Sequence, residues 1–188
     1  MVITSVTRDD LPDGGAHQFA NTIRQINRLL PNASTDVLIP DVRGLKENLS
    51  IVLDAKPTIL AHNLETVPRL YKTARQYSNY QTSLKILAWT KEIEPAIFTK
   101  SGIMLGLGET REEVLHTMED LRKVNCDFLT IGQYLRPTPK NVEVVEYIHP
   151  DIFQHYKEDG EQLGFRYVAS DPFVRSSFHA EEALEHIK

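Results

Sequence analysis

The chain has 188 residues, enough for one domain with a continuous hydrophobic core. Its formal net charge is −5 with dispersed basic residues, which does not indicate a nucleic-acid groove. No apolar run is long enough to cross a bilayer, and Met1 leads into strand-like sequence rather than a secretory signal. The single cysteine, Cys126, excludes an internal disulfide and any cysteine-only metal cluster built from this chain alone, and its apolar neighbours predict a buried structural thiol.

The first half of the chain alternates predicted strands with predicted helices. Apolar, β-branched runs predict strands at residues 1–6, 37–41 and 58–61. Helices are predicted at residues 19–30 and 45–55, from near residue 68, and again from about residue 82. Polar residues follow the strands: a loop rich in Asp, Pro and Gly follows the first, and His62 to Thr66 follow the third.

The centre of the chain is a predicted strand, glycine loop and helix. A short buried strand is predicted at residues 103–105, and Gly106 and Gly108 end it. Thr110 and Glu113 have the spacing of a capping box, which begins a helix. The glycines alone do not complete a dinucleotide fingerprint and also fit a plain turn. In α/β proteins, however, ligands bind at this kind of junction.

The second half continues the alternation and sets the predicted fold class. A strand is predicted at residues 128–131, a helix at 150–163 and a last strand at 165–169. Strands that alternate with helices predict an α/β protein with a parallel sheet and right-handed crossovers. Because every strand end carries polar residues, a barrel or part-barrel fits better than a doubly wound sheet, which remains the alternative.

Each of these polar strand ends also has a purely structural explanation. Histidine is often satisfied inside a fold, asparagine can cap a helix, serine can close a turn, and a cation can simply be solvated. The residues open to such explanations are His62, Asn63, Lys100, Gln133, Tyr134, Arg175, Ser176 and Ser177. If the strand ends converge at one barrel mouth, their polar groups need partners, and a ligand would supply them.

Five segments of the chain resemble lipoyl synthase, a radical S-adenosylmethionine enzyme. They are residues 4–15, 62–71, 99–110, 130–135 and 174–180, in the order of the family. The resemblance spans nearly the whole chain and implies a partial (β/α)6, TIM-like barrel. It implies a radical part-barrel at residues 1–164, with the family's first strand upstream of Met1, and a C-terminal segment at 165–188 with an Arg-Ser-Ser motif.

The resemblance also implies an activity. The family inserts two sulfur atoms at C6 and C8 of a protein-bound octanoyl group. One [4Fe–4S] cluster cleaves S-adenosylmethionine to a 5′-deoxyadenosyl radical, and a second, auxiliary [4Fe–4S] cluster is the sulfur donor. Implied partners are octanoylated lipoyl carrier domains (the glycine-cleavage H protein and 2-oxoacid dehydrogenase E2) and a reductant such as ferredoxin or flavodoxin, with no nucleic acid and no membrane. The expected compartment is the mitochondrion in a eukaryote and otherwise the cytoplasm.

Cofactor-binding residues are implied at four strand ends. The first loop would receive the methionyl amine, the second lies near the ribose, the third beside adenine, and the fourth near the cofactor. In chain order these residues are Thr4, Ser5, Asp9, Asp10, Asn63, Glu65, Gly106, Glu109, Gln133, Tyr134 and Leu135. Ile103 and Leu105 are expected to pack on the adenine base.

The Arg-Ser-Ser motif is implied to supply a ligand to the auxiliary cluster. We expect Ser177, with Ser176 second, because a hydroxyl oxygen binds iron less softly than a thiolate and can leave when a sulfur is handed over. Support for the cluster or the substrate is expected from Arg175, Lys100 and Arg136. No residue is assigned a catalytic role, since the radical is generated at a cluster.

The family's two cysteine triplets, CxxxCxxC and CxxxxCxxxxxC, are expected upstream of Met1, because Cys126 cannot supply six thiolates. The chain by itself is therefore expected to be inactive, with an aggregation-prone open edge at residues 2–6. A rival from another class is a non-catalytic nucleotide- or lipoyl-carrier-binding module without clusters. A third is a part-barrel aldolase or lyase with Lys100 as a Schiff base, although nothing in the sequence marks Lys100 as desolvated.

Overall fold

The polypeptide folds around a six-stranded parallel β-sheet in the computed structural model, which describes residues 1–177 and 180–185. Phe178 and His179, from the last family-like segment, lie outside the described residues. The strands stand in the sheet in their chain order, and every neighbouring pair is parallel. They are β1 (Val2–Thr4), β2 (Asp36–Leu38), β3 (Ile59–Ala61), β4 (Phe98–Leu105), β5 (Phe128–Gln133) and β6 (Tyr167–Ser170).

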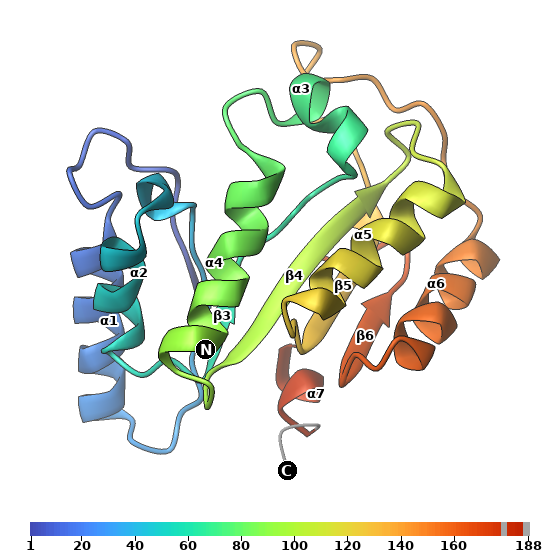
Figure 1. Ribbon diagram of the computed structural model, residues 1–188. Helices are drawn as coiled ribbons and strands as arrows, with labels where there is room; N and C mark the ends of the chain where they lie inside the picture. Colours follow the sequence, from blue (N-terminus) through green and yellow to red (C-terminus); the bar gives the residue numbers. More distant parts are fainter. Residues whose placement is uncertain (178–179, 186–188) are drawn as a thin grey trace.

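The helices that connect the strands cover one face of the sheet (Figure 1). Because right-handed crossovers join strands in consecutive order, each helix returns on the same side. A doubly wound sheet would reverse its strand order and carry helices on both faces. The predicted part-barrel is thus confirmed over that alternative. The helices are α1 (Ala16–Leu29), η1 (Val42–Gly44), α2 (Lys46–Leu53), η2 (Pro68–Leu70), α3 (Tyr71–Ala74), α4 (Tyr80–Ile93), α5 (Arg111–Lys123), α6 (Pro150–Gln162) and α7 (Ala180–Glu185).

Side chains alternate between the two faces of each strand, and this alternation builds the core. On the helix-covered, convex face, Val37 and Leu60 pack in one apolar cluster and Ile103 in another. On the opposite, concave face, Phe128 contacts Ala183 of α7. Among the described helices, none has both the length and the apolar character that a membrane crossing requires.

Local sequence explains where α5 begins but not where β4 begins. The predicted capping box is present: Glu113 N donates to Thr110 Oγ1 at 3.3 Å, and Thr110 N donates to Glu113 Oε2 at 2.8 Å. β4 starts at Phe98, well before the predicted strand start at residue 103. Its polar residues are buried because they have tertiary partners; Thr99 N, for example, donates to Asp127 Oδ2 at 2.9 Å.

Candidate functional site

A cavity of about 910 Å³ opens at the carboxyl end of the central strands, where parallel barrels bind their ligands. Its walls come from the turn after β3, the segment after α3, the glycine loop after β4 and the segment after β5. Figure 1 shows these segments around α3, at the top of the molecule. Of the predicted site residues, the cavity brings together Glu65, Tyr134 and Leu135.

Glu65 reaches the cavity because the pairing register between β3 and β4 shifts by one residue. Ala61 pairs with Lys100, whereas Glu65 forms a parallel bridge with Ile103, so the β3 side holds one extra residue. Glu65 adopts a left-handed φ of 66°, which is uncommon outside glycine. Two backbone hydrogen bonds to β4, each of 2.8 Å, hold it there. A strained turn that is fixed in this way is typical of functional sites.

Two buried polar atoms without partners in the described structure lie close to Glu65 in the chain. Asn63 Nδ2 donates to Glu65 Oε1 at 3.0 Å, but the buried Asn63 Oδ1 has no hydrogen-bond partner among the described residues. Thr66 lines the cavity, and its Oγ1 likewise has no hydrogen-bond partner in the part of the chain that the structure describes. A Cβ on Gly102 would lie 2.8 Å from Thr130 Oγ1 and 3.0 Å from Asn63 Oδ1. Since buried polar atoms are normally paired, the unpaired Asn63 Oδ1 and Thr66 Oγ1 indicate where hydroxyl or amino donors of a ligand could bind.

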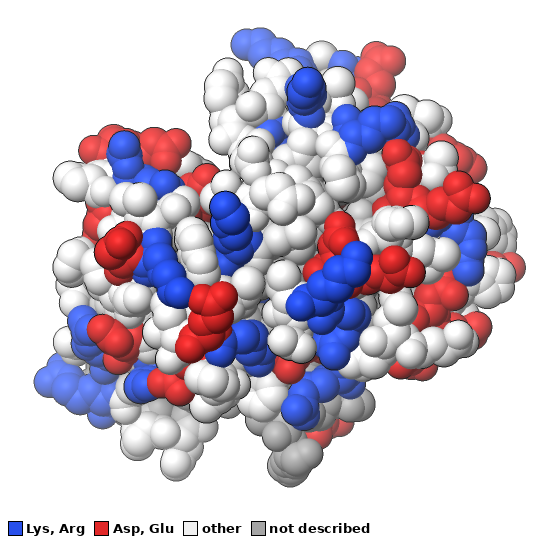
Figure 2. Space-filling view, in the orientation of Figure 1, with Lys and Arg blue, Asp and Glu red and all other residues white. Residues whose placement is uncertain are grey.

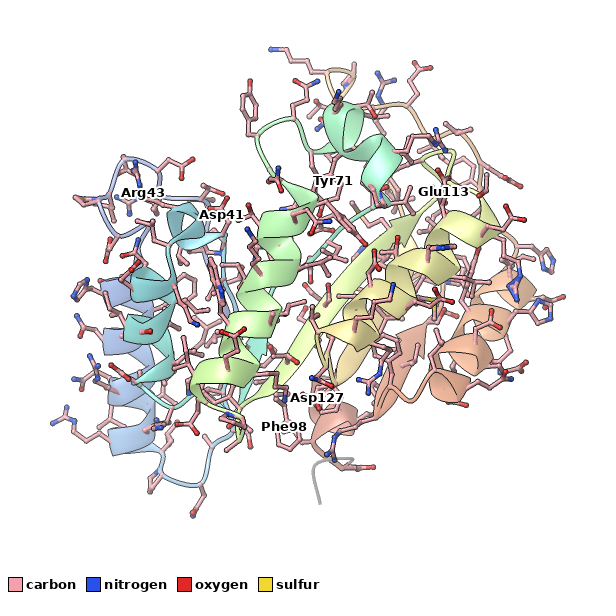
Figure 3. All side chains as sticks on the ribbon, viewed as in Figure 1. Asp41, Arg43, Tyr71, Phe98, Glu113 and Asp127 are labelled. Carbon is pink, nitrogen blue, oxygen red and sulfur yellow. The ribbon has the colours of Figure 1, made fainter. Side chains whose placement is uncertain are left out.

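Arg75, which no sequence pattern indicated, braces this turn. Its Nη1 donates to Asn63 O at 2.7 Å and to Leu64 O at 3.2 Å. The hydroxyl of Tyr71, which Figure 3 labels, donates to Leu64 O at 2.8 Å. Burial raises the pKa of Tyr71, so its hydroxyl remains a neutral donor. Arg75 follows α3 without a motif around it, and only the fold places it in the cavity wall.

The glycine loop after β4 is closed by its own carboxylate. Glu109 Oε1 accepts from Gly106 N at 2.6 Å, and Glu109 Oε2 accepts from Leu107 N at 2.9 Å. Both predicted residues of this loop, Gly106 and Glu109, therefore set its shape. Their predicted contact with the cofactor stays a prediction.

An arginine ties the glycine loop to the segment after β3. Arg69 makes a forked pair with Glu113, with Nε–Oε1 and Nη2–Oε2 distances of 2.7 and 2.9 Å, and its Nη2 donates to Gly108 O at 2.8 Å (Figure 3 labels Glu113). Hydrogen bonds from Arg69 and then from Thr110 N lower the pKa of Glu113 to about 2. Arg69 thus ties the glycine loop and the start of α5 to η2.

Gln133 and Arg136 hold the far wall. Gln133 Nε2 donates to Tyr134 O at 3.0 Å and to Glu146 O at 3.1 Å, and its Oε1 accepts from Ile148 N at 3.0 Å. Arg136 lies outside the cavity lining and makes hydrogen bonds to the following loop, including Nε to the carbonyl of residue 141 at 2.9 Å. Both predicted side chains position backbone around the cavity.

Gly106→Ala is expected to destabilise this wall. Gly106 has a φ of 99°, and a Cβ there would lie 2.3 Å from Gln133 Nε2 and 2.4 Å from Glu146 O. We expect urea denaturation to show a loss of about 1–3 kcal/mol in unfolding free energy. Gly164→Ala is the control, since Gly164 has a φ of 86° but no atom within 4 Å of the added Cβ. Equal losses in both variants would contradict the steric explanation.

The expectation for Ile103 and Leu105 is wrong. Both side chains are buried on the convex face, in the cluster that includes Val114 at the start of α5. Because side chains alternate along a strand, it is Met104 that lines the cavity, together with Leu107 of the glycine loop. These two are among the apolar groups available to a flat ligand ring.

The loop after β1 does not share this cavity, contrary to the expectation that all strand ends converge on one site. Asp9 lines a separate hollow of about 440 Å³ with Asp41 and Arg43, and Arg43 Nη1 donates to Asp9 O at 3.0 Å (Figure 3). Asp10 is exposed and forms an ion pair with Arg8 at 2.7 Å. The other two predicted residues of this loop, Thr4 and Ser5, are exposed as well.

The Arg-Ser-Ser motif lies elsewhere too, within residues 171–177, here called the strap. The strap turns onto the concave face instead of ending at the cavity. A Cβ on Gly132 would lie 2.2 Å from Val174 O, and Lys100 Nζ donates to Ser176 O at 2.9 Å. Ser177 is exposed. Lys100 is only 3% exposed, so the interpretation of a solvated charge is wrong.

The described residues cannot by themselves hold an iron–sulfur cluster, and the contribution of Ser177 to one stays a prediction. Cys126 is fully buried, as predicted, and burial raises its pKa to about 12. Cluster ligation needs several thiolates. Among residues 1–177 and 180–185, no group of three or more His, Cys, Asp or Glu side chains is placed to hold a metal ion.

Comparison with known proteins adds the family. No protein-family model matches the chain. Curated lipoyl synthases of Caldanaerobacter subterraneus subsp. tengcongensis, Caldicellulosiruptor bescii and Aquifex aeolicus are 54%, 53% and 52% identical to it over 184, 188 and 184 residues. The alignments cover 98%, 100% and 98% of this chain and 64%, 65% and 67% of those proteins, so the chain spans about two thirds of their length.

Among solved structures, the radical S-adenosylmethionine methyltransferase TsrM from Kitasatospora setae, with cobalamin and a [4Fe–4S] cluster bound, is similar with a TM-score of 0.49 and 15% identity. That match covers 72% of this chain and 27% of the methyltransferase. The curated sequences are far more similar, with half or more of the aligned residues identical over nearly the entire chain. The chain therefore belongs to the lipoyl synthase family.

Proposed function

We propose that this chain carries the adenosyl-binding part of a lipoyl synthase. The enzyme would insert two sulfur atoms at C6 and C8 of a protein-bound octanoyl group by a 5′-deoxyadenosyl radical mechanism. The observation that carries the proposal is the 54% identity to a lipoyl synthase over 98% of the chain. That identity favours the enzyme over a non-catalytic binding module.

The cavity has the groups that an adenosyl ligand needs. S-adenosylmethionine would supply the 5′-deoxyadenosyl group when bound. Glu65 can accept hydrogen bonds from ribose hydroxyls, and the unpaired Asn63 Oδ1 beside it is a second acceptor. Met104, Leu107 and Tyr134 offer apolar and aromatic surface for the adenine ring. Burial of these contacts would exclude water from the 5′ carbon of the adenosyl group.

The clusters and partners belong to the proposal as well. The two [4Fe–4S] clusters would be held chiefly by cysteines that these 188 residues do not contain. Octanoylated H protein and E2 domains would be the substrates, and a ferredoxin or flavodoxin the reductant. The relatives are bacterial, which favours a cytoplasmic setting over a mitochondrial one. Figure 2 shows acidic and basic side chains interspersed over the helix-covered face, without the single-sign surface typical of nucleic-acid binding.

A chimera tests the function directly. The aligned part of the Caldanaerobacter lipoyl synthase would be replaced by this chain, and the protein reconstituted anaerobically with iron and sulfide. We expect lipoyl formation on an octanoylated H protein, detected by mass spectrometry. A chimera that is folded and iron-loaded, yet yields neither 5′-deoxyadenosine nor lipoyl product, would reject the proposal.

Glu65→Gln is expected to weaken nucleoside binding about tenfold, because a carboxylate accepts stronger hydrogen bonds from ribose hydroxyls than an amide does. The dissociation constant of S-adenosylhomocysteine would be measured by calorimetry on the chimera. Glu119→Gln is the control, since Glu119 is exposed on α5 and away from the cavity. Equal affinities of the Glu65→Gln and unmodified chimeras would show that the ribose does not meet Glu65.

A further inference from the structure

Lys100 is a buried cation with partners on two sides. The residue is 3% exposed and its side chain lies on the concave face of β4. Its Nζ forms an ion pair with Asp36 of β2, itself 5% exposed, and donates to Ser176 O of the strap at 2.9 Å. A buried ammonium group is costly unless its charge is paired and its donors are satisfied. The carboxylate supplies the charge, and the strap supplies a second acceptor.

Strand register explains how this ion pair crosses the sheet. Asp36 is in register with Ile59 of β3, and Ile59 with Phe98 of β4. Lys100 is two residues after Phe98 in β4, so its side chain points to the same face of the sheet. Ile59, Phe98 and Phe128 form the apolar cluster on which α7 packs. Lys100 therefore projects onto the face that carries this apolar cluster, and among the described residues its ammonium is paired with Asp36 and with the strap.

The strap is attached to the sheet at successive points along its length. The Pro172 carbonyl accepts from the backbone of β5 at 3.2 Å. Val174 is 3% exposed and packs against Gly132. Lys100 then binds the carbonyl of Ser176, which ties the lower part of the strap to β4 before the chain reaches α7.

We propose that Lys100, oriented by Asp36, is the positioning residue that fixes the Arg-Ser-Ser motif on the concave face. The ammonium takes a backbone carbonyl, and so leaves both serine hydroxyls available to a ligand. Ser177 follows the anchored carbonyl directly, so its location depends on that anchor. This inference rests on the proposed function only for its purpose, because the family resemblance implies that Ser177, or else Ser176, supplies a ligand to the auxiliary cluster.

The double variant Asp36→Leu/Lys100→Met tests the anchor without leaving a buried charge unpaired. A buried ion pair can be replaced by apolar side chains with little loss of stability, so this variant is expected to fold. We expect tryptic cleavage after Arg175 in the full chain to be at least tenfold faster, and hydrogen exchange of residues 171–177 to be faster, with exchange in α5 unchanged. A folded double variant with unchanged strap cleavage and exchange would overturn the proposal.

Lys91→Met is the matched control. Lys91 is also largely buried, pairs with Asp127 at 2.5 Å and donates to Ile97 O at 2.9 Å, but it has no contact with the strap among the described residues. Its loss should leave cleavage after Arg175 unchanged. Lys100→Arg keeps a charged donor of similar length, so the strap should remain largely protected from cleavage after Arg175. If Lys91→Met frees the strap as much as the double variant does, general loosening is the cause and the proposal fails.

These measurements need neither cluster nor substrate, so they are independent of the enzyme assignment. A freed strap in the double variant together with an inactive chimera would keep the positioning role and reject the proposed function. A strap that stays protected in the double variant, together with an active chimera, would reject the positioning role and keep the proposed function.

Discussion

Asp36→Leu alone should cost about 3–5 kcal/mol of unfolding free energy, the largest loss that we expect from a single substitution in this chain. The change leaves the Lys100 ammonium, 3% exposed, without its counter-charge. The remaining carbonyl of Ser176 cannot neutralise it. Urea denaturation followed by circular dichroism would measure the loss.

Two comparisons make this result specific. The double variant Asp36→Leu/Lys100→Met removes both charges and should regain most of the lost stability. Asp54→Leu changes an exposed aspartate at the end of α2 and should stay within about 0.5 kcal/mol of the unmodified chain. If the single and double variants were equally unstable, an unpaired buried charge would not be the cause.

Acidification should lower the unfolding free energy by about 3 kcal/mol between pH 7 and pH 4 through His62 alone. His62 is 2% exposed, with Nδ1 3.0 Å from Ile39 O and Nε2 3.1 Å from Ser83 Oγ. Burial is the main cause that lowers its pKa from 6.5 to about 4. The unfolded chain therefore takes up a proton at a higher pH than the folded one, and stability falls as the pH drops through this window.

The window differs from that of Asp13 and Glu113. Their pKa values are each lowered to about 2, from 3.8 and 4.5, so their stabilising effect is lost mainly as the pH falls from those starting values toward 2. His62→Gln should flatten the pH dependence between about pH 6.5 and 4.5. His116→Gln, at an exposed position of α5, should retain it. An unchanged slope in His62→Gln would rule out the buried imidazole as the source.

The features that could be predicted from sequence are those encoded by neighbouring residues. Thr110 and Glu113 are close in the chain, so their capping box could be recognised and begins α5 as expected. The apolar runs gave all six strands in order, and the apolar neighbours of Cys126 correctly indicated burial. The long family-like segments identified lipoyl synthase, which the curated relatives support.

The errors concern residues whose environment is made by distant parts of the chain. The start of β4 was missed because Lys100 looks like a solvated charge until Asp36, 64 residues earlier, is placed beside it. Arg75 has no motif, and its role arises from backbone carbonyls of Asn63 and Leu64. Ile103 was assigned to the ligand because its strand was known but the face it occupies was not.

The sequence by itself therefore determined the family, the order of the strands and the alternation of strands with helices, and the approximate positions of the polar loops, but not α7. Only the tertiary structure decided which of these loops share a cavity, which face each strand residue occupies, and that the strap lies along the concave face. The physical reason is that caps and periodicity depend on contacts within one or two helical turns or along one strand. Pairing across the sheet depends on register and on the burial of charges, which exist only after distant segments have packed together.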